Sequence, residues 1–380
     1  MFKKTLKIIL IIVIIIFSYA VLDMFSINSK IINRDLVTWN ISNIRNPQTK
    51  KLMRYLDDLY AYGLYTISEK NKNYYINLDE RDQLPDSKVI KKTNNFSENL
   101  YPVSNVGKDW KRNYGGHASN RFSSLKLINK ENLNKLGLAW EYKIKGKPTY
   151  DIQSNALVAD KKIFLASSNK KIIALDAMTG KLIWEFQLED NSPRRGMLYL
   201  EKDNIQPARI VFSSYKKLIV LDAKNGKKIK SFGKNGIVKL KRPSITSPAV
   251  FEKNLVLTTS KPSLEVYDLN SGDLKWKFIL SKEVKGRNGG KRYDSSGGNP
   301  WGGFSLDEKR GIAYVTTGNA GFYFNGVNRP GKNNYANSIV AIDIKNKKKL
   351  WDFQEVRHDI WNLDIPAPPI LGSITKKNKK

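Results

Sequence analysis

Short apolar runs that end in an aspartate and a polar turn recur along the chain from residue 174 onward. Their four aspartates are 46, 46 and 75 residues apart. A repeat of about 40 to 50 residues, with several short strands in each unit, is typical of propeller blades. The pattern predicts an all-β fold, an incomplete β-propeller of about four blades. The repeats are Ala174–Lys181, Val220–Lys227, Val266–Asp273 and Ala341–Lys348.

Each repeat predicts a strand, a tight hairpin turn and a second strand. Three of the four turns close on glycine, which tolerates positive φ, and the fourth has Lys347 at that position. A tryptophan follows the aspartate by eight residues in three repeats, as Trp184, Trp276 and Trp351, whereas the second repeat has Lys230 there. We expect each tryptophan to pack between its own blade and the next.

The wider spacing before the last repeat marks inserted loops. The extra residues include 285–300 and 321–334. Insertions in a propeller lie in the connections between strands, where binding sites are usually built. We therefore look for the chemistry of the protein in these segments.

The N-terminus has the pattern of an export signal. Three lysines lie within residues 1–7, and residues 8–22 are apolar except for Ser18 and Tyr19. Lysines on this flank predict a cytoplasmic N-terminus. We favour an uncleaved membrane helix over a signal peptide cut near Ala20, which predicts an inner-membrane anchor with a periplasmic domain, or a secreted periplasmic protein if cleavage occurs.

These features divide the chain into three parts. Residues 1–23 form the signal anchor or signal peptide, and residues 108–380 form the partial propeller. Residues 24–107 contain no repeat and are interpreted as a stalk or cap, with one helix expected around residues 47–68 because leucine and tyrosine recur there at helical spacing.

Charge and composition narrow the choice of partners. The formal net charge is +31, but the lysines are spread over the whole chain and accompany many Ile and Asn residues, so we expect no nucleic-acid partner. The chain has no cysteine. This excludes disulfides, thiolate zinc sites and a covalently attached c-type haem within it, and any electrons must leave through a partner.

From Asp109 onward the chain resembles the quinoprotein dehydrogenases of the membrane-bound glucose and alcohol type, which use pyrroloquinoline quinone (PQQ). The resemblance is carried by short motifs in the family's order, in addition to the repeats. They are Asp109-Trp110, Tyr114-Gly115-Gly116, Arg121-Phe122-Ser123, Leu138-Ala139-Trp140, Phe232-Gly233-Lys234-Asn235-Gly236, Thr317-Gly318-Asn319, Arg329-Pro330-Gly331 and His358-Asp359-Ile360-Trp361.

The resemblance implies an eight-bladed propeller, of which this chain contains the N-terminal half. It also implies PQQ and Ca²⁺ as cofactors, a sugar or alcohol as substrate, oxidation at the periplasmic face, and ubiquinone or a cytochrome as electron acceptor. An open half-propeller leaves strand edges exposed. We therefore expect either a second chain that completes the propeller or little activity from this chain alone.

The resemblance also assigns the cofactor-binding residues. Trp301 matches the tryptophan that forms the floor under the quinone ring, a role that suits a broad aromatic face. Arg195 matches the arginine that pairs with a quinone carboxylate. Asn169 and Lys171 fall where the glucose-type enzymes carry a histidine and an arginine above the ring.

The metal and catalytic positions depart from the family's pattern. Asn319 matches the amide ligand of Ca²⁺, but the expected acidic ligand is missing from Thr258–Ser263. The family's general base is an aspartate at the position of Asn362, and an amide cannot take up a proton near neutral pH. Asp364 is our first choice for the base, and Asp359 is the other.

Two further readings stay open. The chain could be a non-catalytic propeller scaffold, like the outer-membrane assembly propellers that share the tryptophan-containing repeat. It could also be a decayed fragment without a stable function.

Overall fold

The computed structural model describes residues 109–149, 151–260, 262–281, 283–285, 291–293, 298–321 and 333–372, together with Gln48, Thr49, Leu52 and Tyr55. The chain divides into two compact units, Met1–Ser97 with Phe324–Gly331, and Glu98–Tyr323 with Lys332–Lys380. The four described residues of the first unit are helical, in accord with the helix expected there. The predicted anchor 1–23 lies outside the described residues, among which no helix is long and apolar enough to cross a membrane.

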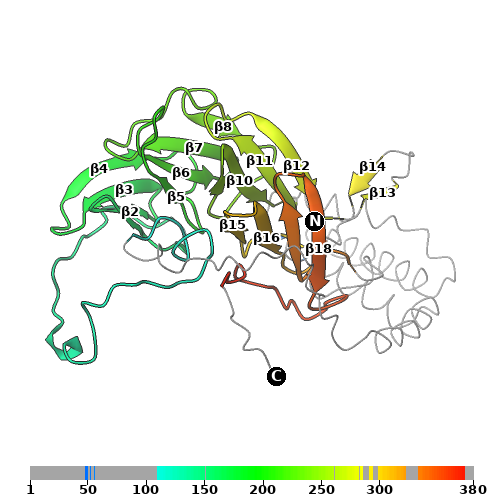
Figure 1. Ribbon diagram of the computed structural model, residues 1–380, viewed down its shortest axis with the longest axis horizontal. Coiled ribbons are helices and arrows are strands. Elements are labelled where there is room, and N and C mark those ends of the chain that lie inside the picture. The colour runs from blue at the N-terminus through cyan, green and yellow to red at the C-terminus, as the bar shows by residue number, and fades with distance from the viewer. Residues whose placement is uncertain are drawn as a thin grey trace, which may run out of the picture. The chain divides into compact units, whose positions relative to one another are not determined.

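The second unit is built from four-stranded antiparallel sheets, each formed by strands consecutive in sequence (Figure 1). The first sheet contains β1 (Leu157–Ala159), β2 (Lys162–Ala166), β3 (Lys171–Asp176) and β4 (Leu182–Gln187). The second contains β5 (Leu198–Leu200), β6 (Arg209–Ser214), β7 (Lys217–Asp222) and β8 (Ile237–Lys239).

The third sheet contains β9 (Ala249–Phe251), β10 (Asn254–Thr259), β11 (Ser263–Asp268) and β12 (Leu274–Ile279). The fourth contains β15 (Phe304–Asp307), β16 (Ile312–Thr316), β17 (Ser338–Asp343) and β18 (Lys348–Gln354). A small hairpin of β13 (Glu283–Lys285) and β14 (Lys291–Tyr293) lies between them in sequence, and a 3-10 turn, η3 (Leu133–Lys135), precedes β1. Within the described residues of the second unit, the expectation of an all-β fold with four blade-like sheets is confirmed.

The repeated aspartates organise the hairpins that join the third and fourth strands of each sheet. Asp176 Oδ1 accepts hydrogen bonds from the backbone N–H groups of Met178 and Thr179, at 3.1 and 2.8 Å. Asp222 and Asp268 make the same pair of contacts in their own turns. This side-chain bonding closes the turn locally, which explains why the aspartate recurs.

The last position of each turn has positive φ, as the sequence predicts. Gly180, Gly226 and Gly272 have φ of +67°, +70° and +79°. Lys347 adopts +55° at the corresponding position of the fourth turn, a conformation that costs a residue with a side chain some free energy.

Buried apolar side chains join each sheet to the next, as they do between blades. One cluster includes Phe164 of the first sheet and Phe212 of the second. A second cluster joins the second and third sheets, and a third cluster joins the third and fourth. Trp184 is 8% exposed at the first of these interfaces, and its Nε1 donates to Ala223 O, so its predicted place between two blades is confirmed.

A segment before β1 crosses the first strands of all four sheets. Trp110 pairs with Val158, and the backbone N–H of Tyr199 donates to Lys111 O. His117 accepts at Nε2 from the N–H of Val250, and its carbonyl accepts from the N–H of Leu306. These contacts hold the innermost strands at fixed positions around one pocket.

Candidate functional site

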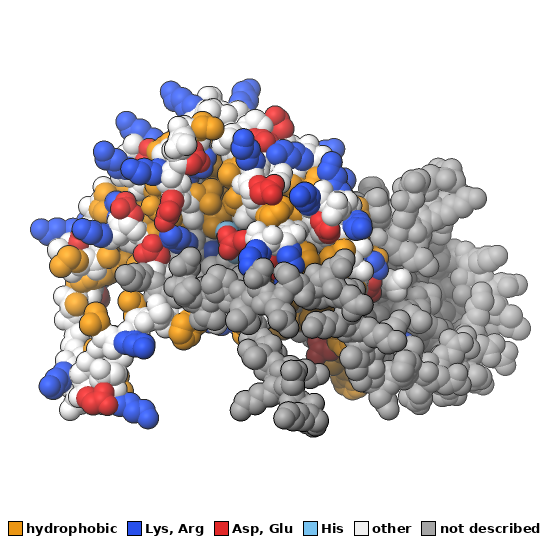
Figure 2. All heavy atoms as spheres, viewed as in Figure 1, with side chains coloured by type: hydrophobic (Ala, Val, Ile, Leu, Met, Phe, Trp, Pro, Cys, Tyr) orange, Lys and Arg blue, Asp and Glu red, His pale blue; other side chains and the backbone are white. Residues whose placement is uncertain are grey.

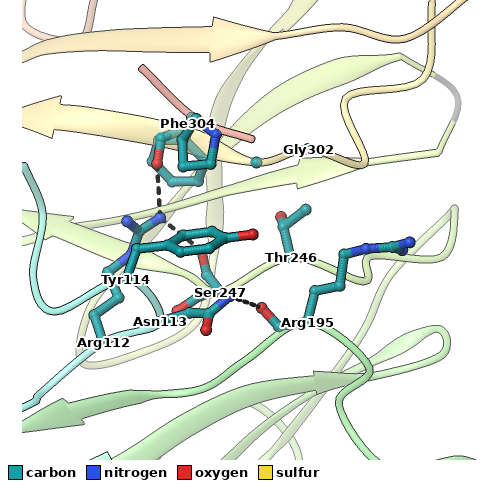
Figure 3. A pocket seen from close by; sticks show the side chains of 10 residues that line it. Arg112, Asn113, Tyr114, Arg195, Thr246, Ser247, Gly302 and Phe304 are labelled. Carbon is teal, nitrogen blue, oxygen red and sulfur yellow. Dashed lines mark hydrogen bonds between the residues drawn. The ribbon is translucent and has the colours of Figure 1, made fainter. Parts of the chain in front are cut away.

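The pocket lies where this crossing segment meets the connections that enter β5, β9 and β15 (Figure 3). About 230 Å³ of space not filled by atoms lies between its lining residues, and part of this space is open to solvent. In a four-stranded antiparallel sheet, the fourth strand ends at the end of the sheet where the second strand turns into the third. The connection to the next sheet therefore starts from that end. The pocket is lined by Arg112, Asn113, Tyr114, Arg195, Thr246, Ser247, Gly302, Gly303, Phe304 and Pro368.

Arg112 forms the wall of the pocket and is 2% exposed. Its Nε donates to Pro248 O at 2.7 Å, and its Nη2 donates to the carbonyls of Ser247 and Phe304 at 3.0 and 2.9 Å. The guanidinium also lies 4.8 Å from the centre of the Phe304 ring. Burial lowers the pKa of Arg112 to about 10, so the group stays charged at neutral pH.

Arg195 and Trp301 come together although they are far apart in the sequence. The Arg195 guanidinium lies 4.5 Å from the centre of the Trp301 ring. Its backbone is fixed because its N–H donates to Ile245 O and its carbonyl accepts from Asn113 Nδ2. Burial, followed by the neighbouring Arg194, lowers the pKa of Arg195.

Arg195 forms no ion pair within the described part of the chain, whereas its neighbour Arg194 pairs with Asp151 at 3.3 Å. A half-buried guanidinium without a carboxylate partner is costly unless an anion reaches it. Beside an indole face, it suits a flat ligand that carries an acidic group.

Trp301 also lies close to the predicted metal ligand Asn319 and the predicted base Asp364, with Gly318 beside them. A Cβ on Gly318 would stand 2.8 Å from Trp301 Nε1 and 2.2 Å from Asp364 Oδ1. These two atoms are therefore at most 5.0 Å apart, the sum of the two distances. The Asp364 carboxylate also accepts a hydrogen bond from the backbone N–H of Asn319, whose side chain is buried. Trp301, Asn319 and Asp364 thus form one cluster.

Asp359 is placed differently from Asp364. It is 2% exposed, and its carboxylate accepts from the backbone N–H groups of Trp361 and Leu363 at 2.7 and 2.6 Å. Asn337 Nδ2 adds a third hydrogen bond at 2.8 Å. A carboxylate that accepts three hydrogen bonds in closing a loop favours a structural role for Asp359, and Asp364 stays the first choice for the base.

Asn337 links the two loops of this cluster. Its side chain also donates to Leu363 O at 2.7 Å, and its backbone N–H donates to Gly318 O at 2.8 Å. Asn337 is fully buried and has φ of +46°. This role could not be predicted from the sequence, because nothing in the local pattern relates Asn337 to the loop after β18.

The remaining predicted positions are Asn362, in the segment after β18, Asn169, in the turn before β3, and Lys171, the first residue of β3. Asn362 is exposed and has φ of +60°, a conformation that asparagine tolerates well. Asn169 contacts Ser167 and Lys145 O, and Lys171 pairs with Glu185 on β4 at 2.7 Å. The contacts of Asn169 and Lys171 are thus with the first sheet and the segment before it, and they do not include Trp301.

Within the described residues, no group of three or more His, Cys, Asp or Glu side chains could hold a metal ion. The position of the missing acidic ligand is occupied by hydroxyl groups, because Thr258 pairs with Thr246 at 2.7 Å and Thr259 pairs with Ser263 at 2.6 Å. The motif Arg329-Pro330-Gly331 and most of both predicted insertions lie outside the described residues.

Comparison with known proteins identifies this arrangement. Residues 110–380 match the family model of the glucose/ethanol/alcohol dehydrogenase β-propeller domain. The chain belongs to this family. The match begins at Trp110, the first residue of the crossing segment that pairs with β1.

Curated relatives are about a quarter identical to the chain over the aligned residues. It is 26% identical over 326 residues to quinoprotein glucose dehydrogenase A of Acinetobacter calcoaceticus, covering 71% of this chain and 40% of that protein. It is 27% identical over 339 residues to quinoprotein glucose dehydrogenase of Escherichia coli, covering 75% and 41%. The chain thus spans about 40% of the length of these dehydrogenases.

Solved structures of the family share the fold. The quinohemoprotein alcohol dehydrogenase of Comamonas testosteroni superposes with a TM-score of 0.60 at 23% identity, over 70% of this chain and 44% of that chain. A europium-containing methanol dehydrogenase gives a TM-score of 0.59 at 21% identity, over 72% and 53%. These likenesses concern the propeller alone.

Proposed function

We propose that this chain supplies the PQQ-binding part of a dehydrogenase that oxidises a sugar or an alcohol. The observation that carries the proposal is the Arg195 guanidinium stacked on Trp301 at the edge of a pocket, with no acidic partner in the described chain. PQQ is a flat tricyclic quinone with carboxylates, so a cation beside an aromatic face matches both of its properties.

The pocket offers further groups for the same ligand. Thr246 and Tyr114 line it beside Arg195, and Figure 3 shows the three side chains around one space. Hydroxyl groups at these positions would hold the polar edge of the quinone, and Trp301 would support its ring. When bound, PQQ supplies the oxidant that takes two electrons from the substrate carbinol.

Calcium fits the donor set only in part. The Asn319 amide would be one ligand, and the nearby Asp364 carboxylate offers an anionic oxygen, which suits a hard cation. The hydroxyls of Thr258 and Thr259 stand where a further carboxylate is expected. We therefore infer weak Ca²⁺ binding.

Asp364 is the proposed general base. It lies close to Trp301, the residue proposed to support the quinone ring, and it is partly exposed. A carboxylate in this place would accept the alcohol proton, which the amide of Asn362 cannot do near neutral pH. Asp359 would hold the loop in position.

The setting of the reaction follows from the rest of the sequence. We propose an inner-membrane anchor, or secretion if the signal is cleaved, with the propeller in the periplasm and ubiquinone or a cytochrome as acceptor. A second polypeptide would supply the remaining blades. Figure 2 shows Lys and Arg side chains scattered among Asp and Glu on the visible face, which supports no concentrated polyanion site.

The test is a titration of the full chain with PQQ, with and without Ca²⁺, followed by tryptophan fluorescence. Arg195→Met should weaken PQQ binding by about 10- to 100-fold, the loss of one charge-assisted contact. Trp301→Ala should remove the saturable quenching. Arg194→Met is the matched control, because Arg194 is exposed and pairs with Asp151.

Equal affinity of the Arg195 and Arg194 variants would refute the assigned anion contact. A folded protein without saturable PQQ binding would refute the dehydrogenase proposal and leave the scaffold or the decayed fragment.

A further inference from the structure

Two of the sequence motifs meet at the edge of the pocket. They are Tyr114-Gly115-Gly116 and Arg121-Phe122-Ser123. The Arg121 guanidinium lies 4.5 Å from the centre of the Tyr114 ring. The backbone N–H of Arg121 also donates to Tyr114 O at 3.0 Å. These two contacts close the loop 114–121.

The loop holds both of these residues in an unusual backbone conformation. Tyr114 has φ of +65°, and Arg121 has φ of +52°. Positive φ costs free energy for a residue with a large side chain, and such positions are often found at ligand sites. The loop therefore needs contacts that keep Tyr114 in this conformation.

Hydrogen bonds inside the loop fix its main chain. The N–H of Gly115 donates to Arg112 O at 3.0 Å, and Arg112 Nη1 donates to Ser119 Oγ at 3.4 Å. The N–H of Ser119 donates to Gly116 O at 3.1 Å. These bonds leave the side-chain torsions of Tyr114 unrestricted, so the stacked guanidinium of Arg121 is a contact that restricts them.

The Tyr114 side chain lines the pocket. Figure 3 shows its hydroxyl directed into the space that Thr246 and Arg195 border. This hydroxyl forms no hydrogen bond with any residue that the structure describes. It is therefore available to a bound ligand.

The surroundings of Tyr114 favour an anionic ligand. Burial lowers the pKa of Arg112 and of Arg195, and Tyr114 is close enough to both guanidinium groups to oppose this lowering. With Arg121 on its ring, Tyr114 thus has three cations around it. The residues that line the pocket include no Asp or Glu. A phenol among cations donates strongly to an anion, because the cations stabilise the negative charge that its oxygen gains.

Arg121 is placed to act through Tyr114 rather than on the ligand. It is exposed, and it is not among the residues that line the pocket. Its stacking on the ring sets where the hydroxyl points.

We propose that Arg121 is a positioning residue, which holds the Tyr114 hydroxyl in the pocket as the donor to a second carboxylate of the ligand, next to the one paired with Arg195. The inference rests on the proposed function, in which this ligand is PQQ. It assigns separate donors to separate acidic groups, the guanidinium of Arg195 and the hydroxyl of Tyr114.

The first test is a PQQ titration of the full chain, followed by tryptophan fluorescence. Tyr114→Phe should weaken PQQ binding by about 3- to 10-fold, the loss of one hydrogen bond. Arg121→Met should weaken it by about 2- to 5-fold, and Arg121→Lys, which keeps a cation over the ring, should restore most of the affinity. In the Tyr114→Phe background, Arg121→Met should have almost no effect, because no hydroxyl is left to position.

Lys126→Met is the matched control, because Lys126 is an exposed cation on the same segment and its loss changes the net charge equally. It should leave the affinity for PQQ unchanged. The same loss of affinity in Lys126→Met and Arg121→Met would overturn the proposal in favour of net charge. An equal effect of Arg121→Met with and without the Tyr114 hydroxyl would also overturn it.

A second measurement needs no PQQ. In the chain labelled with ¹³C in its tyrosine rings, the Tyr114 signal is the one that Tyr114→Phe removes. Arg121→Met should shift this signal, because the ring loses its stacked cation, and Lys126→Met should not. An unchanged Tyr114 signal in Arg121→Met would overturn the positioning role, whatever the PQQ titration gives.

The two measurements separate this inference from the proposed function. Saturable PQQ binding that is equal in all variants would refute only the roles of Arg121 and Tyr114. No PQQ binding by the folded, unsubstituted chain would refute the proposed function, and the assigned carboxylate contact with it.

Discussion

Replacement of Arg112 tests whether the crossing segment holds the inner strands together. In Arg112→Met, the carbonyls of Pro248, Ser247 and Phe304 each lose a donor. A buried acceptor left without a partner costs about 1–3 kcal/mol, and relief of the guanidinium's desolvation offsets part of the total. We expect a net loss of about 3–5 kcal/mol in the free energy of unfolding.

The assay is urea unfolding of the full chain, followed by circular dichroism. With a slope of about 3 kcal/mol per molar, the midpoint should fall by about 1–1.7 M. Arg121→Met is the control, since Arg121 is exposed and lies 4.5 Å from the Tyr114 ring centre, a contact worth about 1 kcal/mol or less. The same midpoint for both variants would refute the structural role assigned to Arg112.

Three further predictions concern the turns and the loop of the cluster. Gly226→Ala should cost about 2 kcal/mol or more in thermal unfolding, because φ is +70° and a Cβ would meet the Trp184 ring. Asn337→Ala should raise hydrogen exchange in the loop that Asp359 closes and destabilise the protein by about 1–3 kcal/mol. Hydrogen bonds, above all from the backbone N–H of Ser271, lower the pKa of the Asp268 carboxyl to about 2. Asp268→Asn should therefore be less stable than the unsubstituted protein above about pH 4. This difference in stability should vanish as the pH falls through about 2.

Each of these predictions has a control. Gly137→Ala should leave the melting temperature unchanged, because a Cβ there meets nothing within 4 Å. Asn362→Ala should leave the hydrogen exchange of the Asp359 loop largely unchanged relative to Asn337→Ala, since Asn362 is exposed. A difference in stability between the unsubstituted protein and Asp268→Asn that does not change with pH would contradict the assigned role of the carboxylate in the turn.

The repeats determined the local structure because their chemistry acts within a few residues. The turn aspartates and glycines, the alternation of strands and the tryptophan of β4 could all be predicted from spacing, and the structure has them where expected. The motifs also pointed to Trp301, Arg195, Asn319 and Asp364 as members of a single site.

Tertiary structure alone decided how these residues are used. The stacking of Arg195 on Trp301 joins segments about a hundred residues apart, and local pattern carries no information on such a distance. The sequence ranked Asp364 ahead of Asp359 only because Asp364 is nearer to Asn362, whereas their hydrogen bonds distinguish a loop-closing carboxylate from one beside Trp301.

The same reason explains what the sequence did not reveal. Arg112 and Asn337 act through the carbonyls and side chains of distant loops, so their importance depends on packing rather than on their neighbours. Trp140 could be predicted from the sequence only in part. Its motif could be read from the sequence, but only the structure showed that its ring packs on the turn of the first sheet at Ala177 and Gly180.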